Sequence, residues 1–346
     1  MTRKRTTAAV LAVLGVTALT LTAWTSLAGA NSSRQNGTVV GAGSTFVAPL
    51  VAKWQANYKP SKIVYSGVGS GAGIAAISGR TVNFGASDAP MSKDQFSGCH
   101  GCVQIPWAFS ATSIPYNVEG VGTGLKLTGT ILAGIYSGSI KYWDSSAIKK
   151  INSGKNLPHQ KIVPIYRSDA SGTSYNFTDY LSHVSKSWKS GIGKGTQPNF
   201  PVGVGAKGSS GVAGKLKTTN GGITYVDVAY SLKNHLSMAR IKNRAGNYEL
   251  PGLRQIKAAS LSLTKLKSKD NSITVVDPNP RAKKAYPICT FTYIILATKS
   301  NNAAELKKFV DWALTKGQSY GPKLLFVPLP KIVQTAARKT LSRVHS

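Results

Sequence analysis

Residues 38–88 read TVVGAGSTFVAPLVAKWQANYKPSKIVYSGVGSGAGIAAISGRTVNFGASD, and this stretch decides the fold class of the 346-residue chain. Three of its runs are rich in Val, Ile, Tyr and Phe and are bounded by Gly, Ser or Asp, which is typical of β-strands. The segments between these runs have helical patterns. The predicted strands are 38–43, 62–67 and 81–87, and the predicted helices are 48–58 and 74–79. Strands separated by helices predict an α/β fold with mainly parallel sheets.

The same alternation extends along the rest of the chain. Further strands are predicted at KIVPIY (161–166), GITYV (222–226) and FTYIILA (291–297). Residues 303–316 have the clearest helix pattern, because apolar residues recur at the spacing i, i+3, i+4, i+7 and i+8. These residues are Leu306, Phe309, Val310, Ala313 and Leu314. A chain of this length can hold two ordinary domains, and we find neither a repeat period nor a long linker.

The N-terminal segment has the pattern of a secretory signal peptide. A basic start at residues 3–5 precedes an apolar run over 8–23, and the small residues AGA at 28–30 suit a signal peptidase. We expect residues 1–30 to be removed on export, and an uncleaved anchor helix is the alternative. No Cys follows the cleavage site, so we expect no lipid anchor. The mature chain is then expected in the periplasm or on the exterior of the cell envelope.

Basic residues dominate the composition. The chain has 43 Lys and Arg against 12 Asp and Glu, a formal charge of +31 that falls to +28 if residues 1–30 are removed. Natural partners of such a chain are anions, whether phosphate, a polyanion or a membrane surface. The densest basic run is 253–269, but its lysines are scattered and no helix-turn-helix, zinc finger or aromatic single-strand motif is present. We expect a solvated basic surface and no specific nucleic acid.

The three cysteines suggest one local disulfide bond and one buried thiol. Cys99 and Cys102, in CHGC, are close enough for a local disulfide in an oxidising compartment. A redox site is one alternative. A zinc site is another, but His100 adds only a third ligand where four are usual, so we expect no metal. Cys289 lies in the apolar run YPICTFTYIIL and is expected to be buried.

Four short turns carry the candidate chemistry. Each follows a predicted strand and precedes a helical segment: GAGSTF (41–46), GVGSGAG (67–73), FGASD (84–88) and YRSDASGTS (166–174). Gly lets the backbone approach a ligand, Ser and Thr supply hydroxyl groups, and the free N–H groups at a helix start attract an anion. Ordinary N-capping explains each turn taken singly. Together, three helix starts could converge on one oxyanion.

Catalytic and cofactor motifs are weak or missing in the sequence. GVGSGA fits a dinucleotide fingerprint with Asp88 about 20 residues further on, but that pattern alone is weak evidence. The sequence has no phosphate loop with Gly-Lys-Ser/Thr, no His-Glu-x-x-His and no Gly-x-Ser-x-Gly, and its five His are isolated. We therefore expect no cofactor and no enzyme.

The turns resemble the ligand-binding segments of a known family, the phosphate-binding proteins (PstS family) of the bacterial phosphate-specific ABC importer. The matching segments are GAGSTFVAPL, the GVGSG after KIVYS, VNFGASDAPM and YRSDASGTSYNFTDYL. Scaffold segments of that family are similar to WDSSAIKKIN, GITYVDVAY, AYPICTFTYIIL and LKKFVDWAL, so the resemblance covers nearly all of the mature chain. It implies a two-domain periplasmic-binding-protein fold, type II-like, with the ligand cleft between domains. Domain I would comprise 31–115 plus about 278–346, and domain II about 116–277.

The resemblance also implies a phosphate site. The backbone N–H groups of Thr45 and Phe46, the Thr45 hydroxyl and Ser70 would donate to phosphate, and Asp88 would accept a hydrogen bond from a protonated phosphate oxygen. Arg167 matches the family's one charged donor, and Asp169 would orient it. The last turn would contribute Ser171, Gly172 and Thr173.

The carboxylate gives a physical reason for selectivity. Phosphate has an O–H to donate to Asp88 whereas sulfate has none, so sulfate would leave Asp88 both unpaired and repelled. An unsatisfied buried polar group costs about 1–3 kcal/mol, more when charged, so exclusion of sulfate by a factor of hundreds is reasonable. Molybdate is disfavoured on the same ground, whereas arsenate carries a proton and stays an open alternative.

Three features depart from the family pattern. Asn83 stands where many members have an acidic residue, which we expect to change the rim of the site. The CHGC insert is not part of the core pattern. The basic charge is far above the family's, and we hypothesise an acidic or low-phosphate habitat; stability and binding no better at about pH 3–4 than at pH 7 would contradict that idea.

The resemblance implies capture of phosphate and its delivery to the membrane permease subunits of an ABC importer by a monomeric, non-catalytic protein. Two alternatives from other classes remain: an exported phosphoesterase, and a polyanion-binding surface protein that uses the same oxyanion cradle. Turnover of a chromogenic phosphoester would favour the first. Salt-sensitive binding to DNA or polyphosphate that survives Arg167→Ala would favour the second.

Overall fold

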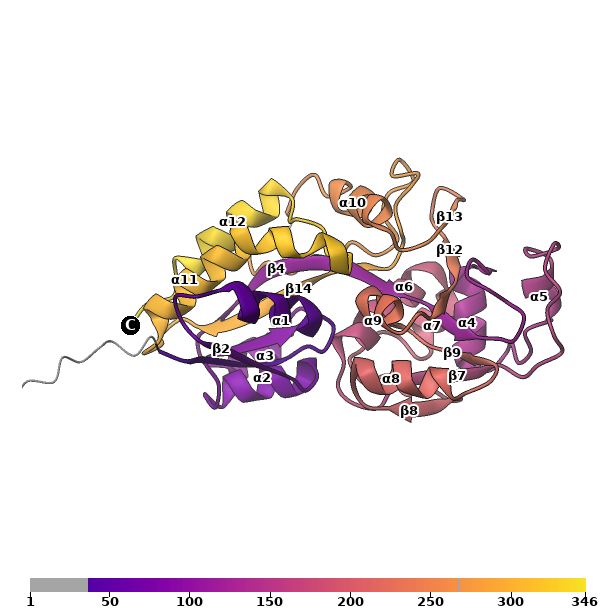
Figure 1. Ribbon diagram of the computed structural model, residues 1–346, viewed down its shortest axis with the longest axis horizontal. Helices are drawn as coiled ribbons and strands as arrows, with labels where there is room; N and C mark the ends of the chain where they lie inside the picture. The colour runs from indigo at the N-terminus through magenta and orange to yellow at the C-terminus, as the bar shows by residue number, and fades with distance from the viewer. Residues whose placement is uncertain (1–36, 267) are drawn as a thin grey trace, which may run out of the picture. The chain divides into compact units, whose positions relative to one another are not determined.

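A six-stranded sheet dominates the computed structural model, which describes residues 37–266 and 268–346 (Figure 1). The predicted signal peptide lies outside the described residues. In spatial order the strands are β10 (Val226–Asp227), β4 (Cys102–Ser113), β14 (Cys289–Ala297), β3 (Phe84–Ser87), β1 (Val39–Gly43) and β2 (Ile63–Gly67). β1 runs parallel to both β2 and β3, so the carboxyl ends of these strands share one edge of the sheet. The three strands predicted within residues 38–88 are confirmed.

The prediction of mainly parallel sheets is wrong. β14 pairs antiparallel with both β3 and β4, and β4 pairs antiparallel with β10. Apart from the two-residue β10, the chain leaves this sheet along β4 and returns to it along β14, so these two long strands carry the chain in opposite directions and pair antiparallel.

β4 is absent from the predicted strands although it is twelve residues long. All twelve residues are buried, and a strand covered on both faces lacks the period-two alternation that reveals half-buried strands. Pro106 adds a second irregularity, because it has no backbone N–H. The pairing with β14 shifts at this point: Thr292 faces Ala108 and Tyr293 faces Pro106, which leaves Trp107 as the extra residue of a bulge.

Two smaller sheets are formed mainly by the middle of the chain. The five-stranded sheet has the order β11 (Ser237–Met238), β5 (Pro115–Asn117), β9 (Gly222–Ile223), β7 (Val163–Arg167) and β8 (Val204–Ala206). The three-stranded sheet has the order β13 (Tyr248–Glu249), β12 (Arg240–Lys242) and β6 (Lys126–Leu127). The predicted strand at 222–226 is divided between two sheets, since β9 joins the five-stranded sheet and β10 the six-stranded one.

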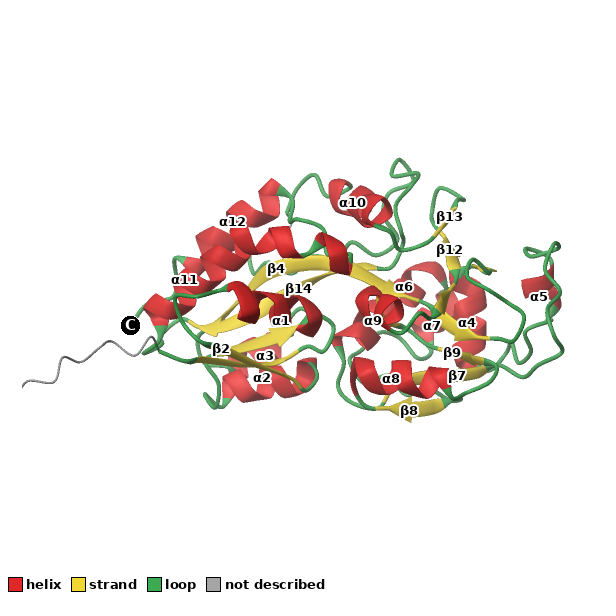
Figure 2. Ribbon diagram, viewed as in Figure 1, coloured by secondary structure: helices red, strands yellow, loops and turns green. Residues whose placement is uncertain are grey.

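Helices cover the sheets (Figure 2). They are α1 (Ala48–Asn57), α2 (Ser70–Ser78), α3 (Lys93–Gly98), α4 (Gly129–Ser137), α5 (Ser146–Lys149), α6 (Gly172–Val184), α7 (Lys186–Ser190), α8 (Gly208–Lys217), α9 (Val228–Lys233), α10 (Leu253–Leu261), α11 (Ala303–Leu314) and α12 (Lys331–Leu341), with 3₁₀ turns at Lys316–Tyr320 and Pro322–Leu324. Within the described ranges, none of these helices is both long and apolar enough to cross a membrane.

Side chains from both faces fix the helices on the six-stranded sheet. On one face, Trp54 of α1 packs edge-on against Trp107 of β4 with ring centroids 5.0 Å apart, and Phe309 of α11 joins them. On the other face, Ile74 and Ile77 of α2 pack in one cluster with Ile295 of β14. The predicted amphipathic helix at 303–316 is confirmed as α11, and its five apolar residues are all buried.

A disulfide joins Cys99 to Cys102 beside α2. Both cysteines lie in the cluster with Ile74 and Ile77, and the Arg80 guanidinium donates to the carbonyl oxygens of Ile77, Cys99 and His100. The disulfide leaves no thiolates for the zinc alternative. Cys289 is buried, as predicted, and burial raises the pKa of its thiol well above the usual value.

Candidate functional site

The predicted turns meet at the carboxyl edge of β1, β2 and β3, where they contact the turn after β7. Two hydrogen bonds donated by backbone N–H groups link the segments. Gly71 N–H donates to the carbonyl oxygen of Ala170 at 3.0 Å, and Gly172 N–H donates to Ser70 Oγ at 3.1 Å. The close approach requires glycine at 172, because a Cβ there would lie 2.7 Å from both Asp88 Cβ and Ser70 Oγ. The structure therefore brings together segments that are about a hundred residues apart in sequence.

Ser44 organises the first turn, although the sequence did not single it out. Its hydroxyl donates to Asp88 Oδ1 at 2.5 Å and accepts from the N–H groups of Phe46 and Val47 at 3.0 and 3.3 Å. The Phe46 N–H, which the resemblance assigns to phosphate, thus bonds to Ser44 Oγ in this structure. Gly43 permits the turn, since its φ of 143° is unusual for other residues and a Cβ would lie 2.1 Å from the Ala86 carbonyl oxygen.

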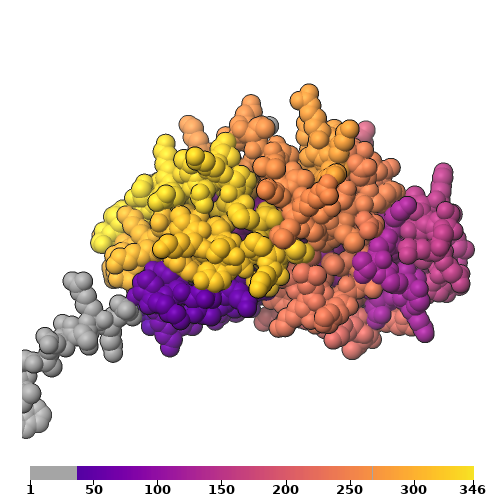
Figure 3. Space-filling model, turned by 45° about the horizontal axis from the view of Figure 1, so that its top comes forward, coloured from indigo at the N-terminus to yellow at the C-terminus, as the bar shows by residue number. Residues whose placement is uncertain are grey.

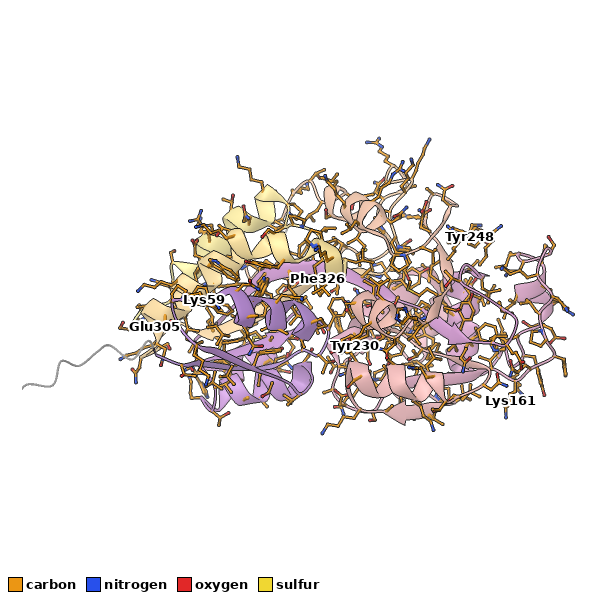
Figure 4. The ribbon with its side chains drawn as sticks, viewed as in Figure 1. Lys59, Lys161, Tyr230, Tyr248, Glu305 and Phe326 are labelled. Atoms are coloured by element: carbon orange, nitrogen blue, oxygen red, sulfur yellow. A yellow bond between two sulfur atoms is a disulfide. The ribbon has the colours of Figure 1, made fainter. Side chains whose placement is uncertain are left out.

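Two tyrosines from outside the turn hold its backbone. Tyr65 O–H donates to the Ser44 carbonyl oxygen at 2.7 Å. Tyr230, labelled in Figure 4, belongs to α9, and its O–H donates to the Thr45 carbonyl oxygen at 3.1 Å. The turn after β1 is therefore supported both by its own sheet and by a helix from the middle of the chain.

Ser209 is a second residue that the sequence interpretation missed. Its hydroxyl lies 2.7 Å from the Thr45 hydroxyl, and its N–H donates to Thr45 Oγ1 at 3.2 Å. It stands in the first turn of α8, in the segment KGSSG. That segment has the Gly and Ser composition of the four turns that were recognised, so the same signal could have found it.

At the end of β7 the buried Arg167 forms an ion pair with Asp169, which is partly buried. Arg167 Nε donates to Asp169 Oδ1 at 2.7 Å, its Nη2 donates to Asp169 Oδ2, and only 4% of Arg167 is exposed. Gly208 N–H donates to Asp169 Oδ1 at 2.9 Å. Burial alone would raise the pKa of the Asp169 carboxyl, but Arg167 and the Gly208 N–H outweigh it, so the pKa is lowered and the carboxylate stays charged.

Two hydroxyl groups at the start of α6 differ in their contacts: one caps the helix, and the other has no hydrogen-bond partner among the described residues. Ser171 Oγ accepts from Ser174 N–H at 3.2 Å, which is the N-cap role of the alternative interpretation. Thr173 Oγ1 is buried and has no hydrogen-bond partner among the described residues. Buried hydroxyl groups are rarely left unpaired, so Thr173 has the unused donor that a ligand oxygen requires.

Asp88 is a buried carboxyl group surrounded by hydroxyl groups. Only 2% of it is exposed, Ser44 donates to one oxygen, and Ser70 Oγ lies 3.5 Å from the other. Burial raises the pKa of Asp88 to about 7, against the lowering effects of Ser44, Arg167 and Ser70. The group can therefore exchange a proton near neutral pH.

Asp227, which no sequence pattern marked as a site residue, is a second buried carboxyl. It is fully buried at the start of α9, where Oδ1 accepts from Ala229 N–H at 2.9 Å, while Oδ2 has no partner in the described part of the chain. Burial raises the pKa of Asp227 well above its usual value, and the charge of Asp88 raises it further.

These two carboxyl groups predict an unusual pH dependence of stability. The unfolded chain releases the Asp88 proton near pH 4, whereas the folded protein keeps it up to about pH 7. Because the folded state then binds more protons, Asp88 lowers the free energy of unfolding by up to about 1.4 kcal/mol per pH unit as pH rises through this window. Asp227 acts in the same direction.

Urea unfolding of the wild type, Asp88→Asn and Asp227→Asn at pH 5 and pH 7 tests this expectation. We expect the stability difference between the wild type and each variant to change between the two pH values. Asp94→Asn, an exposed carboxyl in the first turn of α3, is the matched control and should follow the wild type. Parallel pH profiles for all four proteins would refute the prediction.

Metal-binding residues do not cluster in the described ranges: no three His, Cys, Asp or Glu side chains there are arranged to hold an ion. Asn83, the departure from the family pattern, accepts from Val40 N–H at 2.7 Å and donates to Asn302 Oδ1 at 3.3 Å. Neither contact involves the converging turns.

Comparison with known proteins places the chain in a family. Residues 28–316 match the PBP superfamily domain. The chain is 37% identical over 299 residues to the phosphate-binding protein PstS of Xylella fastidiosa, covering 84% of this chain and 81% of that one. It is 36% identical over 303 residues to PstS of Pasteurella multocida, covering 86% and 87%.

A solved structure shares the fold. The phosphate-binding protein of Stenotrophomonas maltophilia superposes with a TM-score of 0.66 at 21% identity, covering 88% of this chain and 93% of that one. The predicted two-domain periplasmic-binding-protein fold is thereby confirmed. The chain belongs to the PBP superfamily and, within it, to the phosphate-binding protein PstS family.

Proposed function

We propose that this protein binds inorganic phosphate between its two domains and delivers it to an ABC importer. The observation that carries the proposal is the convergence of the buried Asp88 and Arg167, the latter paired with Asp169, at turns that begin α1, α2 and α6. The close relatives named phosphate-binding protein PstS support the choice of ligand.

The proposed contacts divide into one charged donor and several neutral ones. Arg167, already held by Asp169, presents its remaining N–H groups to the oxyanion, and its planar fork gives direction as well as charge. The neutral donors are the backbone and hydroxyl groups of Thr45, Phe46, Ser70, Ser171, Gly172 and Thr173. Thr173 supports this role most directly, because its buried hydroxyl has no partner among the described residues.

Binding would exchange protein hydrogen bonds for bonds to phosphate. Ser70 now bonds to Gly172, and Thr45 bonds to Ser209. Each of these hydrogen bonds joins a segment that follows a strand of the six-stranded sheet to a segment that follows a strand of the five-stranded sheet. Phosphate therefore enters only when these segments separate, and it is enclosed when they close again. Contacts with both sides of the site would favour the closed state.

The division into domains fits this motion. Apart from β10, the strands of the six-stranded sheet come from residues 39–113 and 289–297, and the five-stranded sheet is built from residues 115–238. We propose domain I as 31–115 plus about 278–346 and domain II as about 116–277, with β4 and β14 leading to the two crossings of the chain between them. We also propose that the protein is exported after removal of residues 1–30 and acts as a monomer. It would dock on membrane permease subunits and carry out no covalent chemistry.

Calorimetric titration of residues 31–346, stripped of ligand by unfolding and refolding, tests the function. We expect tight one-to-one binding of phosphate and no turnover of a chromogenic phosphoester. A well-folded protein that fails to bind phosphate, or that hydrolyses the ester, would refute the proposal and favour the phosphoesterase or polyanion alternatives.

A further inference from the structure

Cations and exposed leucines occur together on α10 and the loop 279–284. This α10 surface consists of Leu253, Arg254, Lys257, Leu261, Arg281, Lys283 and Lys284. All seven are exposed, and Leu261, at 65%, is more exposed than the other large apolar residues of the described chain. Figure 3 shows side chains of this part of the chain, in orange, projecting from the molecule.

The exposed face of α10 carries leucines as well as cations. Leu253, Lys257 and Leu261 are spaced by four residues, so they lie on one side of the helix. The opposite side is buried through Ile256 and Ala259. The leucines are therefore not the helix's contribution to the protein core.

The loop beside α10 is held in place by its backbone. Asn243 and Asn247 donate to the Lys283 carbonyl oxygen at 2.9 and 2.8 Å, and Tyr286 N–H donates to the Gln255 carbonyl oxygen at 3.2 Å. Together the loop and the helix border a hollow of about 640 Å³. Its lining includes three cations and, among the described residues, no acidic side chain.

The charges of the α10 surface are not neutralised within the described protein. None of the ion pairs in the described part of the chain involves a cation of the α10 surface. Glu249 contacts α10 through Gln255, whose side-chain amide donates to Glu249 Oε2 at 3.2 Å. Uncompensated cations attract an anionic partner, and the apolar leucines require that partner to have an apolar layer as well.

We propose that the α10 surface binds the face of an anionic lipid bilayer. Lysine and arginine would contact lipid phosphate groups while Leu253 and Leu261 enter the boundary with the acyl chains, which is the chemistry of interfacial amphipathic helices. A polyphosphate or nucleic-acid strand would satisfy the cations and leave both leucines in water. The inference is independent of the phosphate site, since none of its residues belongs to the converging turns.

Co-sedimentation with phosphatidylcholine vesicles, with and without phosphatidylglycerol, tests the proposal on residues 31–346, which contain the whole compact unit 36–346. We expect binding only to the anionic vesicles. Each cation near such a membrane strengthens binding about fivefold, so Arg281→Glu/Lys283→Glu/Lys284→Glu should weaken partitioning by at least about 100-fold. The matched control Lys215→Glu/Lys217→Glu/Lys233→Glu changes the net charge equally at exposed sites on α8 and α9 and should lose much less.

The double variant Leu253→Ser/Leu261→Ser tests the contribution of the leucines to membrane binding separately from that of the cations. This double variant should weaken the vesicle binding that persists at high salt, where electrostatic attraction is screened. Calorimetry should show unchanged phosphate binding in all variants, which confirms that they are folded. Equal loss in the two charge-reversal triples, or no effect of the leucine double variant, would each overturn the proposal.

Discussion

Arg167→Ala is expected to weaken phosphate binding by at least about 30-fold, because truncating one member of a buried, hydrogen-bonded charge pair costs about 2–5 kcal/mol. Arg167 is the charged donor of the proposed site and is 4% exposed. Its loss removes contacts with phosphate and also leaves the Asp169 carboxylate unpaired near a dianion. Calorimetry with phosphate measures the change.

Two further variants separate these causes. Arg167→Ala/Asp169→Asn removes the orphaned carboxylate, so recovery of near-native affinity in this double variant would show that Arg167 acts only by neutralising Asp169. We expect affinity to stay low. Arg254→Ala removes an exposed arginine of α10 and is the matched control, with expected wild-type affinity. Near-native binding by Arg167→Ala itself would remove Arg167 from the site.

Asp88→Asn is expected to reduce the preference for phosphate over sulfate by about 100-fold, since the penalty for leaving a buried charge unpaired disappears. Asparagine keeps the shape of the side chain and can donate to a sulfate oxygen. Titration with both anions near pH 8, where the wild-type carboxyl is ionised, gives the ratio. A variant that still excludes sulfate as the wild type does would contradict the role of Asp88.

The same group should make sulfate exclusion depend on pH. Above about pH 7 Asp88 is ionised in the free protein and has no hydrogen to donate to sulfate, so sulfate binding is coupled to proton uptake. We expect sulfate affinity of the wild type to rise by up to about tenfold per pH unit as pH falls toward about 7, and to level off below it, where Asp88 already holds its proton. Asp88→Asn should show no such slope, and a slope equal to that of the wild type would assign the proton to another group.

The sequence predicted the alternation of strands and helices well where each element has a distinct pattern. The run 38–88 and the amphipathic helix α11 are examples, because short apolar runs bounded by Gly and a 3.6-residue period are local signals. β4 was missed because full burial erases its alternation and Pro106 argues against a strand. The antiparallel pairing of β4 with β14 could not be read locally, since it depends on two crossings of the chain.

The convergence of the turns could be predicted from the sequence, whereas the contacts that support them could not. The Gly, Ser and Thr turns are visible in sequence because each lies between a strand pattern and a helix pattern, where the N–H groups at a helix start attract an anion. The contacts of Ser44 and Tyr230 with the first turn depend on tertiary packing, so spacing could not reveal them. Asp227 lies in a segment that reads as scaffold, and only its burial beside Asp88 marks it as part of the electrostatics of the site.

The most direct test of the account is a crystal structure of residues 31–346 grown with phosphate in the presence of excess sulfate. The account predicts one phosphate, enclosed by Thr45, Ser70, Asp88, Arg167 and the start of α6, with one of its oxygens within hydrogen-bond distance of an Asp88 carboxylate oxygen. An oxyanion bound away from Asp88 and Arg167, or sulfate in the same place, would contradict the central claim.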